Sequence, residues 1–234
     1  MNKEILFQEE LEDELKKQGA DFVHFANIST LQNEQNKNFP YSILIGITLS
    51  PEFIQQISNE PDYMYEMYRT NQLEKVEFYI KEHRADELAD FTENYLIGHG
   101  YQAYSQSEKN LLTNGDFNAQ TKSTPLPHKT IARLSGFGWI GKHNLLVTET
   151  FGSAICMCTV LTNAPLRTEI CKPMNSFCKD CNICKDICFR KAIKGNIWKE
   201  GISRDEIVDV NMCSPCLKCL AHCPWTQKYM KKNL

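Results

Sequence analysis

Eight of the eleven cysteines fall into two runs of identical spacing in the last quarter of the chain. Soft thiolates on a tight loop are the ligands of iron-sulfur clusters, and two such runs are typical of bacterial two-cluster ferredoxins. The doubled run therefore predicts two [4Fe-4S] clusters. The first run consists of Cys178, Cys181, Cys184 and Cys188, and the second of Cys213, Cys216, Cys219 and Cys223, followed by Pro224.

In this pattern the fourth cysteine of each run turns away from its own loop and ligates the neighbouring cluster. By this rule Cys188 ligates the cluster of the second run and Cys223 that of the first, so the two runs form one unit. Phe189 stands where a proline often follows the fourth cysteine, a change that removes no ligand. The predicted ligands are Cys178, Cys181, Cys184 and Cys223 for the first cluster, and Cys188, Cys213, Cys216 and Cys219 for the second.

Two other uses of cysteine fit this spacing less well. Structural zinc takes two Cys-x-x-Cys pairs and does not need a third cysteine at the same spacing followed by a fourth. A disulfide framework suits a short secreted chain, and nothing in this sequence indicates secretion. The iron-sulfur interpretation is therefore preferred.

Length and composition indicate a globular protein with a buried core. The 234 residues suffice for one large domain or two modest ones, and 42% of them are hydrophobic. The first residues lack a basic segment followed by an apolar stretch, and no run of about 18 apolar residues occurs. We therefore expect no membrane span and a cytoplasmic location, in a reducing and oxygen-poor setting.

The net charge of −3 is unevenly distributed. Residues 161–234 carry 13 Lys and Arg against 7 Asp and Glu, a balance of +6, whereas residues 1–160 carry 13 against 22, a balance of −9. The basic part is compatible with a nucleic-acid patch. We prefer another explanation, because clusters bound by four thiolates are anionic and nearby lysines offset that charge.

The N-terminal half alternates helix and strand signals. An amphipathic helix is predicted over 4–18, a strand over 21–28, and a central strand over 42–49, where the apolar run is partly β-branched. Residues 62–96 contain no glycine or proline and predict one long helix or two abutting ones. Another strand is expected over 100–106.

The middle of the chain is more irregular. Residues 107–124 are polar and lack periodicity, which predicts a long loop of functional interest. A short helix over 129–134 follows. Strands over 145–148 and 153–161 flank a predicted hairpin turn at 149–152. The composition then shifts to cysteine, lysine and proline, so we divide the chain into domains at 1–168 and 169–234.

Several segments between residues 123 and 166 resemble the catalytic core of epoxyqueuosine reductases. With the doubled cysteine run behind them, the resemblance extends from Ser123 to Pro224, and the strand over 42–49 is similar more weakly. The order and spacing of the segments make it specific. They are Ser123-Thr-Pro125, Gly136-Phe-Gly-Trp-Ile-Gly-Lys-His143, Leu145-Leu-Val-Thr148, Phe151-Gly-Ser153 and Val160-Leu-Thr-Asn-Ala-Pro-Leu166.

The resemblance implies an α+β fold, in which a nitroreductase-like mixed α/β domain holds cobalamin and a two-[4Fe-4S] ferredoxin-like domain follows it. Such enzymes receive electrons from a low-potential ferredoxin or flavodoxin and pass them through the clusters to cobalt, which does the difficult chemistry. The substrate in the best-known members is the epoxide of a modified nucleoside in tRNA. Reductive dehalogenases are distant relatives with the same cofactors.

Two departures from the family pattern bear on the substrate. Lys122 occupies a position that is commonly acidic in the family and serves as proton donor. The sequence also ends eleven residues after Cys223, whereas typical members continue into helical repeats that help to hold tRNA. Two interpretations therefore stay open: a true epoxyqueuosine reductase, and a shortened relative that acts on a smaller substrate.

The remaining site candidates come from the same segments. His128 is a candidate proton donor because its ordinary pKa is near neutral, although a histidine at a helix start also makes local hydrogen bonds. Lys122 is a second candidate if burial lowers its pKa, and otherwise a solvated loop lysine. The predicted cobalamin contacts are Gly136, Gly138, Trp139, Ile140, Gly141, Lys142 and His143.

Two other functions stay open at this point. The chain could be an electron-transfer protein that reduces a corrinoid or a redox partner without substrate chemistry of its own. It could also be a flavin reductase that binds FMN, as nitroreductase-like folds often do. Cys156 and Cys158 alternate on a predicted strand, and we interpret them as buried apolar residues rather than as a metal site.

Overall fold

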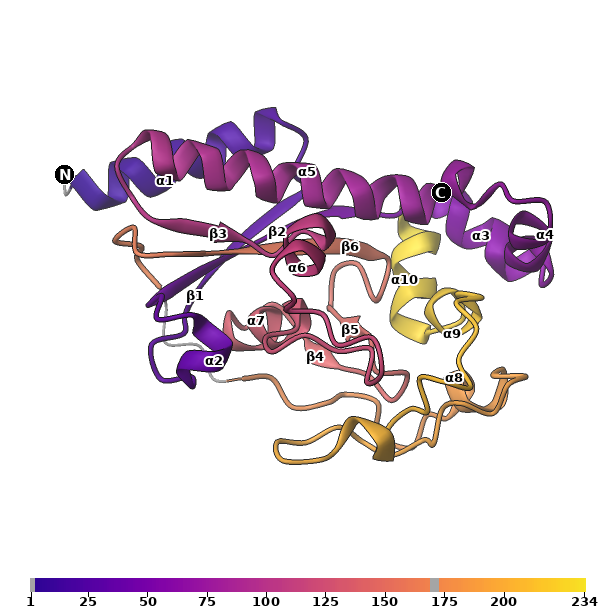
Figure 1. Ribbon diagram of the computed structural model, residues 1–234. Helices are drawn as coiled ribbons and strands as arrows, with labels where there is room; N and C mark the ends of the chain where they lie inside the picture. The colour runs from indigo at the N-terminus through magenta and orange to yellow at the C-terminus, as the bar shows by residue number, and fades with distance from the viewer. Residues whose placement is uncertain (1–2, 169–172) are drawn as a thin grey trace. The chain divides into compact units, whose positions relative to one another are not determined.

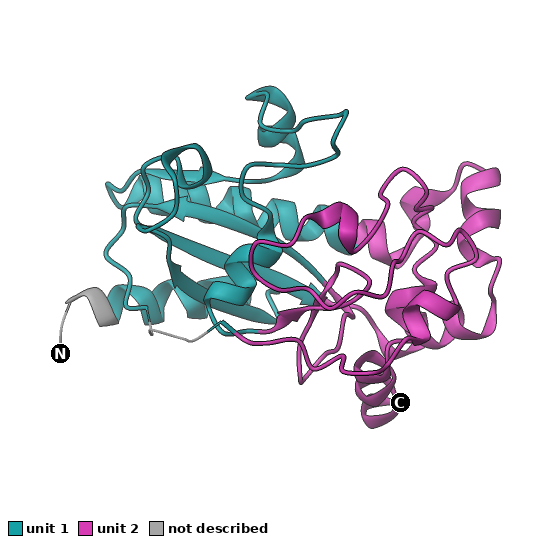
Figure 2. Ribbon diagram, turned by 90° about the horizontal axis from the view of Figure 1, so that it is seen from below, with its two compact units in different colours: residues 1–47, 81–137, 156–173 teal, residues 48–80, 138–155, 174–234 magenta. Residues whose placement is uncertain are grey.

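The computed structural model describes residues 3–168 and 173–234 of the chain (Figure 1). Contacts between residues divide the chain into two compact units, each assembled from segments distant in sequence (Figure 2). The predicted domain boundary after residue 168 adjoins the stretch 169–172, which lies outside the described residues, and this division stays a prediction. Unit 1 comprises residues 1–47, 81–137 and 156–173, and unit 2 comprises residues 48–80, 138–155 and 174–234.

A four-stranded sheet organises unit 1, with strand order β1-β2-β6-β3. Strand β2 lies between β1 and β6, which confirms the predicted central strand, and six of its eight residues are buried. Its apolar residues suit a strand that is covered on both faces. The strands are β1 (Phe22–Asn27), β2 (Tyr41–Thr48), β3 (Ala103–Ser105) and β6 (Ile155–Thr162).

Two antiparallel pairings fix the register of this sheet. Phe22 of β1 lies opposite Gly46 of β2, and Tyr104 of β3 lies opposite Leu161 of β6. Gly46 leaves room for the Phe22 ring, because a Cβ at residue 46 would overlap that ring. The predicted strand over 153–161 therefore exists, but the predicted hairpin with residues 145–148 is wrong, since β6 pairs within this sheet.

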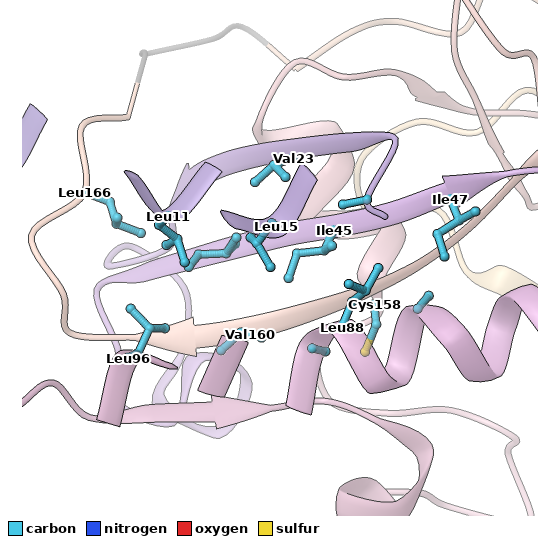
Figure 3. Packing of buried hydrophobic residues seen from close by; sticks show 14 of the residues in the cluster. Leu11, Leu15, Val23, Ile45, Ile47, Leu88, Leu96, Cys158, Val160 and Leu166 are labelled. Atoms are coloured by element: carbon cyan, nitrogen blue, oxygen red, sulfur yellow. The ribbon is translucent and has the colours of Figure 1, made fainter. Parts of the chain in front are cut away.

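Helices α1 (Lys3–Lys17) and α5 (Glu77–Gly98) lie along one face of the sheet (Figure 1). Their apolar residues meet those of β2 and β6 in one buried cluster (Figure 3). The amphipathic spacing that predicted the first helix is thus used for packing. Members of the cluster include Leu11, Leu15, Ile43, Ile45, Leu88, Leu96, Cys158 and Val160.

Three shorter helices complete unit 1. Helix α7 (His128–Leu134), which was predicted, packs against β1. Helix α2 (Asn33–Asn36) lies between β1 and β2 in the sequence. Helix α6 (Glu108–Thr113) falls inside the predicted loop over 107–124, so that prediction is wrong for its first third. The polar helix was missed because it buries only Leu111.

Unit 2 contains a two-stranded sheet of β4 (Trp139–Ile140) and β5 (Leu146–Val147), together with several short helical segments. Helix α3 packs against α9 and α10. The segments are α3 (Pro51–Asn59), α4 (Tyr63–Arg69), the 3-10 helix η1 (Leu73–Lys75), α8 (Ile183–Asp186), the 3-10 helix η2 (Arg204–Glu206), α9 (Lys218–Ala221) and α10 (Pro224–Asn233).

The observed architecture is therefore a mixed α/β fold, in agreement with the coarse fold class predicted from the sequence. In the described part of the chain, no helix has the length and apolarity needed to span a membrane.

Candidate functional site

The thiols of Cys178, Cys181, Cys184 and Cys223 form a first electrostatically coupled group in unit 2. The pKa of Cys184 is raised to about 12, first by burial and then by the charges of Cys178, Cys223 and Cys181. Burial also raises the pKa of Cys223, and the charges of Cys178 and Cys181 add to it. Cys223 comes from the second run of the sequence, yet it interacts with the first.

Cys223 lies at the start of α10, where its thiol accepts hydrogen bonds from the backbone N–H groups of Trp225 and Thr226. These two bonds lower its pKa and partly offset the effect of burial. Donors at a helix start favour a negatively charged ligand atom. The beginning of α10 is therefore suited to hold a thiolate.

A second group gathers around Cys219. Burial raises the pKa of its thiol, and the charges of Cys216, Cys213, Cys184 and Cys188 raise it further. Cys188, the fourth cysteine of the first run, thus interacts with the second run. Cys184 interacts with both groups, so the two groups are neighbours.

No described set of three or more His, Cys, Asp or Glu side chains converges as ligands on a single metal ion. A four-iron cluster has a different requirement, because each of its four irons takes one thiolate and the thiolates stand apart around the cluster. No disulfide joins any described cysteine to another. With Cys184 counted in the first group, four thiols remain for the second group: Cys188, Cys213, Cys216 and Cys219. Four thiolates are the set that a [4Fe-4S] cluster takes.

The predicted cobalamin-contact stretch is divided between the two units. Gly136 belongs to unit 1, where it follows α7 with a φ of 73°. Residues 138–143 belong to unit 2 and are buried. Their glycines make room for the protein itself, since a Cβ at Gly138 would meet the Val147 carbonyl and one at Gly141 would lie 2.7 Å from Cε1 of His143.

Trp139 is fully buried in unit 2. Its ring stacks edge-on against Trp225, with centroids 5.1 Å apart, and against Phe177, with centroids 5.0 Å apart. It shares a buried cluster with Val147 and Cys223, so it packs beside the first thiol group. Among the described residues, its indole N–H has no hydrogen-bond partner.

Lys142 and His143 are about 95% buried. The Lys142 ammonium donates a hydrogen bond of 3.1 Å to Oδ1 of Asn182, which lies between two cysteines of the first run. His143 Nδ1 accepts from the Leu145 N–H, and its Nε2 lies 3.3 Å from the Ser153 hydroxyl, which itself donates to the Leu146 carbonyl. This arrangement fits a neutral imidazole that carries its proton on Nε2.

His128 and Lys122 lie in unit 1. The His128 residue is partly exposed to solvent, but its imidazole ring is buried, and this burial lowers the pKa of the ring to about 4. Its Nδ1 lies 2.9 Å from the Thr159 hydroxyl, which accepts a hydrogen bond from Gln106. The imidazole is therefore neutral at pH 7. Its predicted role as proton donor stays a prediction, and a neutral ring is a weak acid.

The Lys122 side chain is exposed, and its backbone has a φ of 50° in a turn closed by pairing of Asn118 with Ser123. This is the solvated alternative considered for the residue. The role of Lys122 in proton delivery therefore also stays a prediction.

Sequence reasoning missed a cluster of ionisable side chains in unit 1. The Asp116 carboxylate accepts a hydrogen bond of 2.6 Å from the Tyr104 hydroxyl and one of 2.9 Å from the Lys37 ammonium. Burial pushes the Asp116 pKa up, but these two donors outweigh it and the net pKa is lowered. Burial and Asp116 raise the pKa of Tyr104. No linear motif connects these residues.

Comparison with solved structures defines the fold class. The chain matches an epoxyqueuosine reductase bound to a modified tRNA stem loop with a TM-score of 0.60 and 15% identity, over 95% of this chain and 66% of that one. It matches a reductive dehalogenase with a TM-score of 0.61 and 18% identity, over 89% of this chain and 30% of that one. The protein therefore has the mixed α/β fold that these two enzyme classes share.

Sequence comparison narrows the relationship. The chain is 30% identical over 125 residues to the epoxyqueuosine reductase of Atelocyanobacterium thalassa, covering 47% of this chain and 40% of the relative. It is 39% identical over 72 residues to that of Synechococcus sp. strain CC9605, covering 31% and 22%. No family model matches the chain.

The resemblance to epoxyqueuosine reductases predicted from residues 123–224 is thus confirmed. The chain spans less than half the length of these curated relatives. None of these matches supports the flavin alternative.

Proposed function

We propose that the protein is a reductase that carries two [4Fe-4S] clusters and uses cobalamin to reduce its substrate. The observation that best supports the proposal is that Cys223, the last cysteine of the second run, interacts with Cys178 and Cys181 of the first run, as an exchange of fourth cysteines would require. A two-cluster ferredoxin module requires this exchange, whereas separate zinc sites do not.

The thiol groups fit the clusters in their chemistry and in their surroundings. Each group would supply four soft ligands, and Cys184 and Cys223 are buried while Cys219 is partly buried. Unpaired thiols at such depth are unfavourable when ionised, as their raised pKa values indicate, and iron coordination would compensate the thiolates. The clusters would supply one-electron transfer, with electrons from an external ferredoxin- or flavodoxin-type donor.

The proposal of cobalamin rests on the relatives. One matched reductive dehalogenase structure is described in terms of B12-dependent dehalogenation. The predicted contacts do not fit a corrin through their side chains, since Trp139, Lys142 and His143 are buried and directed to partners within unit 2. These residues therefore support no chemical step through cobalamin, and their contact with it stays a prediction.

For the substrate we propose a modified nucleoside, because the curated relatives carry the name epoxyqueuosine reductase and one matched structure holds a modified tRNA stem loop. A smaller substrate is the alternative within the same function. An electron carrier without its own substrate is the second candidate function, and the two four-thiol groups would serve it equally well.

Ligand substitution tests the cluster assignment. The protein is reconstituted anaerobically with iron and sulfide, and about eight irons per chain are expected for two four-iron clusters. Cys223→Ser and Cys181→Ser should alter the same electron paramagnetic resonance signal, that of the first cluster. Cys188→Ser should instead resemble Cys216→Ser.

Cys158→Ser provides the control, because this cysteine lies in the core of unit 1 and is expected to leave both signals intact. Bound zinc in place of iron, or a Cys223→Ser spectrum that matches Cys216→Ser, would overturn the assignment.

The cofactor and the substrate need separate experiments. The reconstituted protein is titrated with cobalamin, and a shift of the visible spectrum towards the base-off form is expected. Epoxide reduction is then assayed on tRNA that contains epoxyqueuosine. Bound cobalamin without turnover would favour a smaller substrate, whereas no spectral shift would favour the electron carrier.

A further inference from the structure

Lys142 is a buried cation beside the first thiol group. Only 5% of the residue is exposed, and the Lys142 ammonium donates a partly buried hydrogen bond to the neutral amide of Asn182, which is itself an exposed residue. Within the described part of the chain, no Asp or Glu forms an ion pair with it. A buried charge is costly unless an opposite charge compensates it.

The surroundings of Lys142 point to the missing negative charge. Asn182 is flanked by Cys181 and Cys184, two members of the first group. Three residues before Lys142, Trp139 packs in the same cluster as Cys223, the fourth member. The short segment from Trp139 to Lys142 thus approaches the first group both at its loop and at the start of α10.

We propose that Lys142 is the counter-ion of the first cluster and raises its reduction potential. This inference rests on the proposed clusters and assigns Lys142 a partner other than cobalamin. A four-iron cluster with four thiolate ligands is anionic and gains one more negative charge on reduction. A fixed cation nearby favours the reduced form, and its effect is strong in a poorly solvated interior.

The test compares the reduction potentials of both clusters in the reconstituted protein, measured by redox titration with electron paramagnetic resonance. In Lys142→Gln, the equilibrium constant for reduction of the first cluster should fall roughly tenfold, which is about 59 mV for one electron. The second cluster should change much less. Lys142→Arg keeps the charge and should stay close to the wild-type potential.

Lys185 offers a matched control. It directly follows Cys184, it is exposed, and its removal causes the same change in net charge. Solvent screens an exposed charge, so Lys185→Gln should change the equilibrium constant for reduction of the first cluster by less than twofold. An equal shift in Lys142→Gln and Lys185→Gln would overturn the proposal, because net charge alone would then explain both.

The remaining outcomes are also distinct. Loss of the first cluster in Lys142→Gln but not in Lys142→Arg would support the counter-ion, and loss in both would show a role in packing instead. Unchanged potentials in Lys142→Gln with two intact clusters would refute the inference and leave the proposed function standing. Wild-type protein that binds no clusters would refute both.

Discussion

Replacing Gly138 with alanine tests whether this glycine serves the fold or a ligand. A Cβ at this position would overlap the Val147 carbonyl, and it would lie 3.2 Å from Cγ2 of Thr148. Val147 pairs with Trp139 across the two-stranded sheet, so its backbone cannot retreat without disturbing that pair. Overpacking of this kind costs about 1–3 kcal/mol.

The expected result is a lower thermal stability in the absence of any cobalamin. For a chain of this size, the cost corresponds to a fall in Tm of roughly 2–12 °C. Circular dichroism on anaerobically reconstituted protein measures it. Gly98→Ala is the control, because a Cβ there meets nothing within 4 Å at the end of α5, and its Tm should change little.

One result would refute this reasoning. If Gly138→Ala has the same Tm as the wild type but binds cobalamin more weakly, the glycine makes room for the cofactor and not for Val147. Reduced stability together with reduced binding would leave the structural explanation in place, since a displaced β4 affects both.

The remaining predictions concern unit 1. The His128 pKa of about 4 lies below the unfolded value of 6.5, so the unfolded chain binds more protons between these pH values and stability is lost as pH falls through that window. Between pH 7.5 and 5.5, the free energy of unfolding of His128→Gln should therefore fall by about 1 kcal/mol less than that of the wild type. An NMR signal of the His128 imidazole that titrates near pH 6.5 would contradict this. Ile45→Ala should cost about 2–5 kcal/mol because Ile45 is fully buried, whereas Ile97→Ala, at a residue 53% exposed, should cost under about 0.5 kcal/mol in the same melting assay.

The sequence predicted the elements whose hydrophobic spacing is used for packing. The first helix, the strands β1 and β2 and the short helix α7 were all anticipated, because Leu11, Leu15 and the apolar residues of β2 follow their elements' periods. Helix α3 was missed although Ser50 caps the Phe53 N–H and the buried Phe53, Ile54 and Ile57 follow a helical period.

The pairing of strands was harder to predict than their positions. The turn at 149–152 exists, since Thr148 pairs with Gly152, but the segments on its two sides enter different sheets. A turn signal is local, whereas the choice of β3 as partner of β6 depends on a distant segment, since Ala103 pairs with Thr162 and Ser105 with Val160.

For the site, the cysteine spacing predicted the interaction of Cys223 with the first run, because the ferredoxin pattern assigns each fourth cysteine to the other run. The exchange of ligands itself stays a prediction. The buried state of Lys142 and the contact between Lys37, Asp116 and Tyr104 had no such signal. Charged side chains are usually exposed, so their burial follows from tertiary packing and not from the residues beside them.

The position of Cys223 has a consequence for the order of assembly. It starts α10 and belongs to the first thiol group, whose other members lie some forty residues earlier. If the fourth ligands are exchanged as proposed, neither run could complete a cluster alone, and metal binding would have to overcome the entropic cost of closing so long a loop. Iron loading and the docking of α10 should therefore occur as one cooperative event, and partly loaded chains should be scarce at equilibrium.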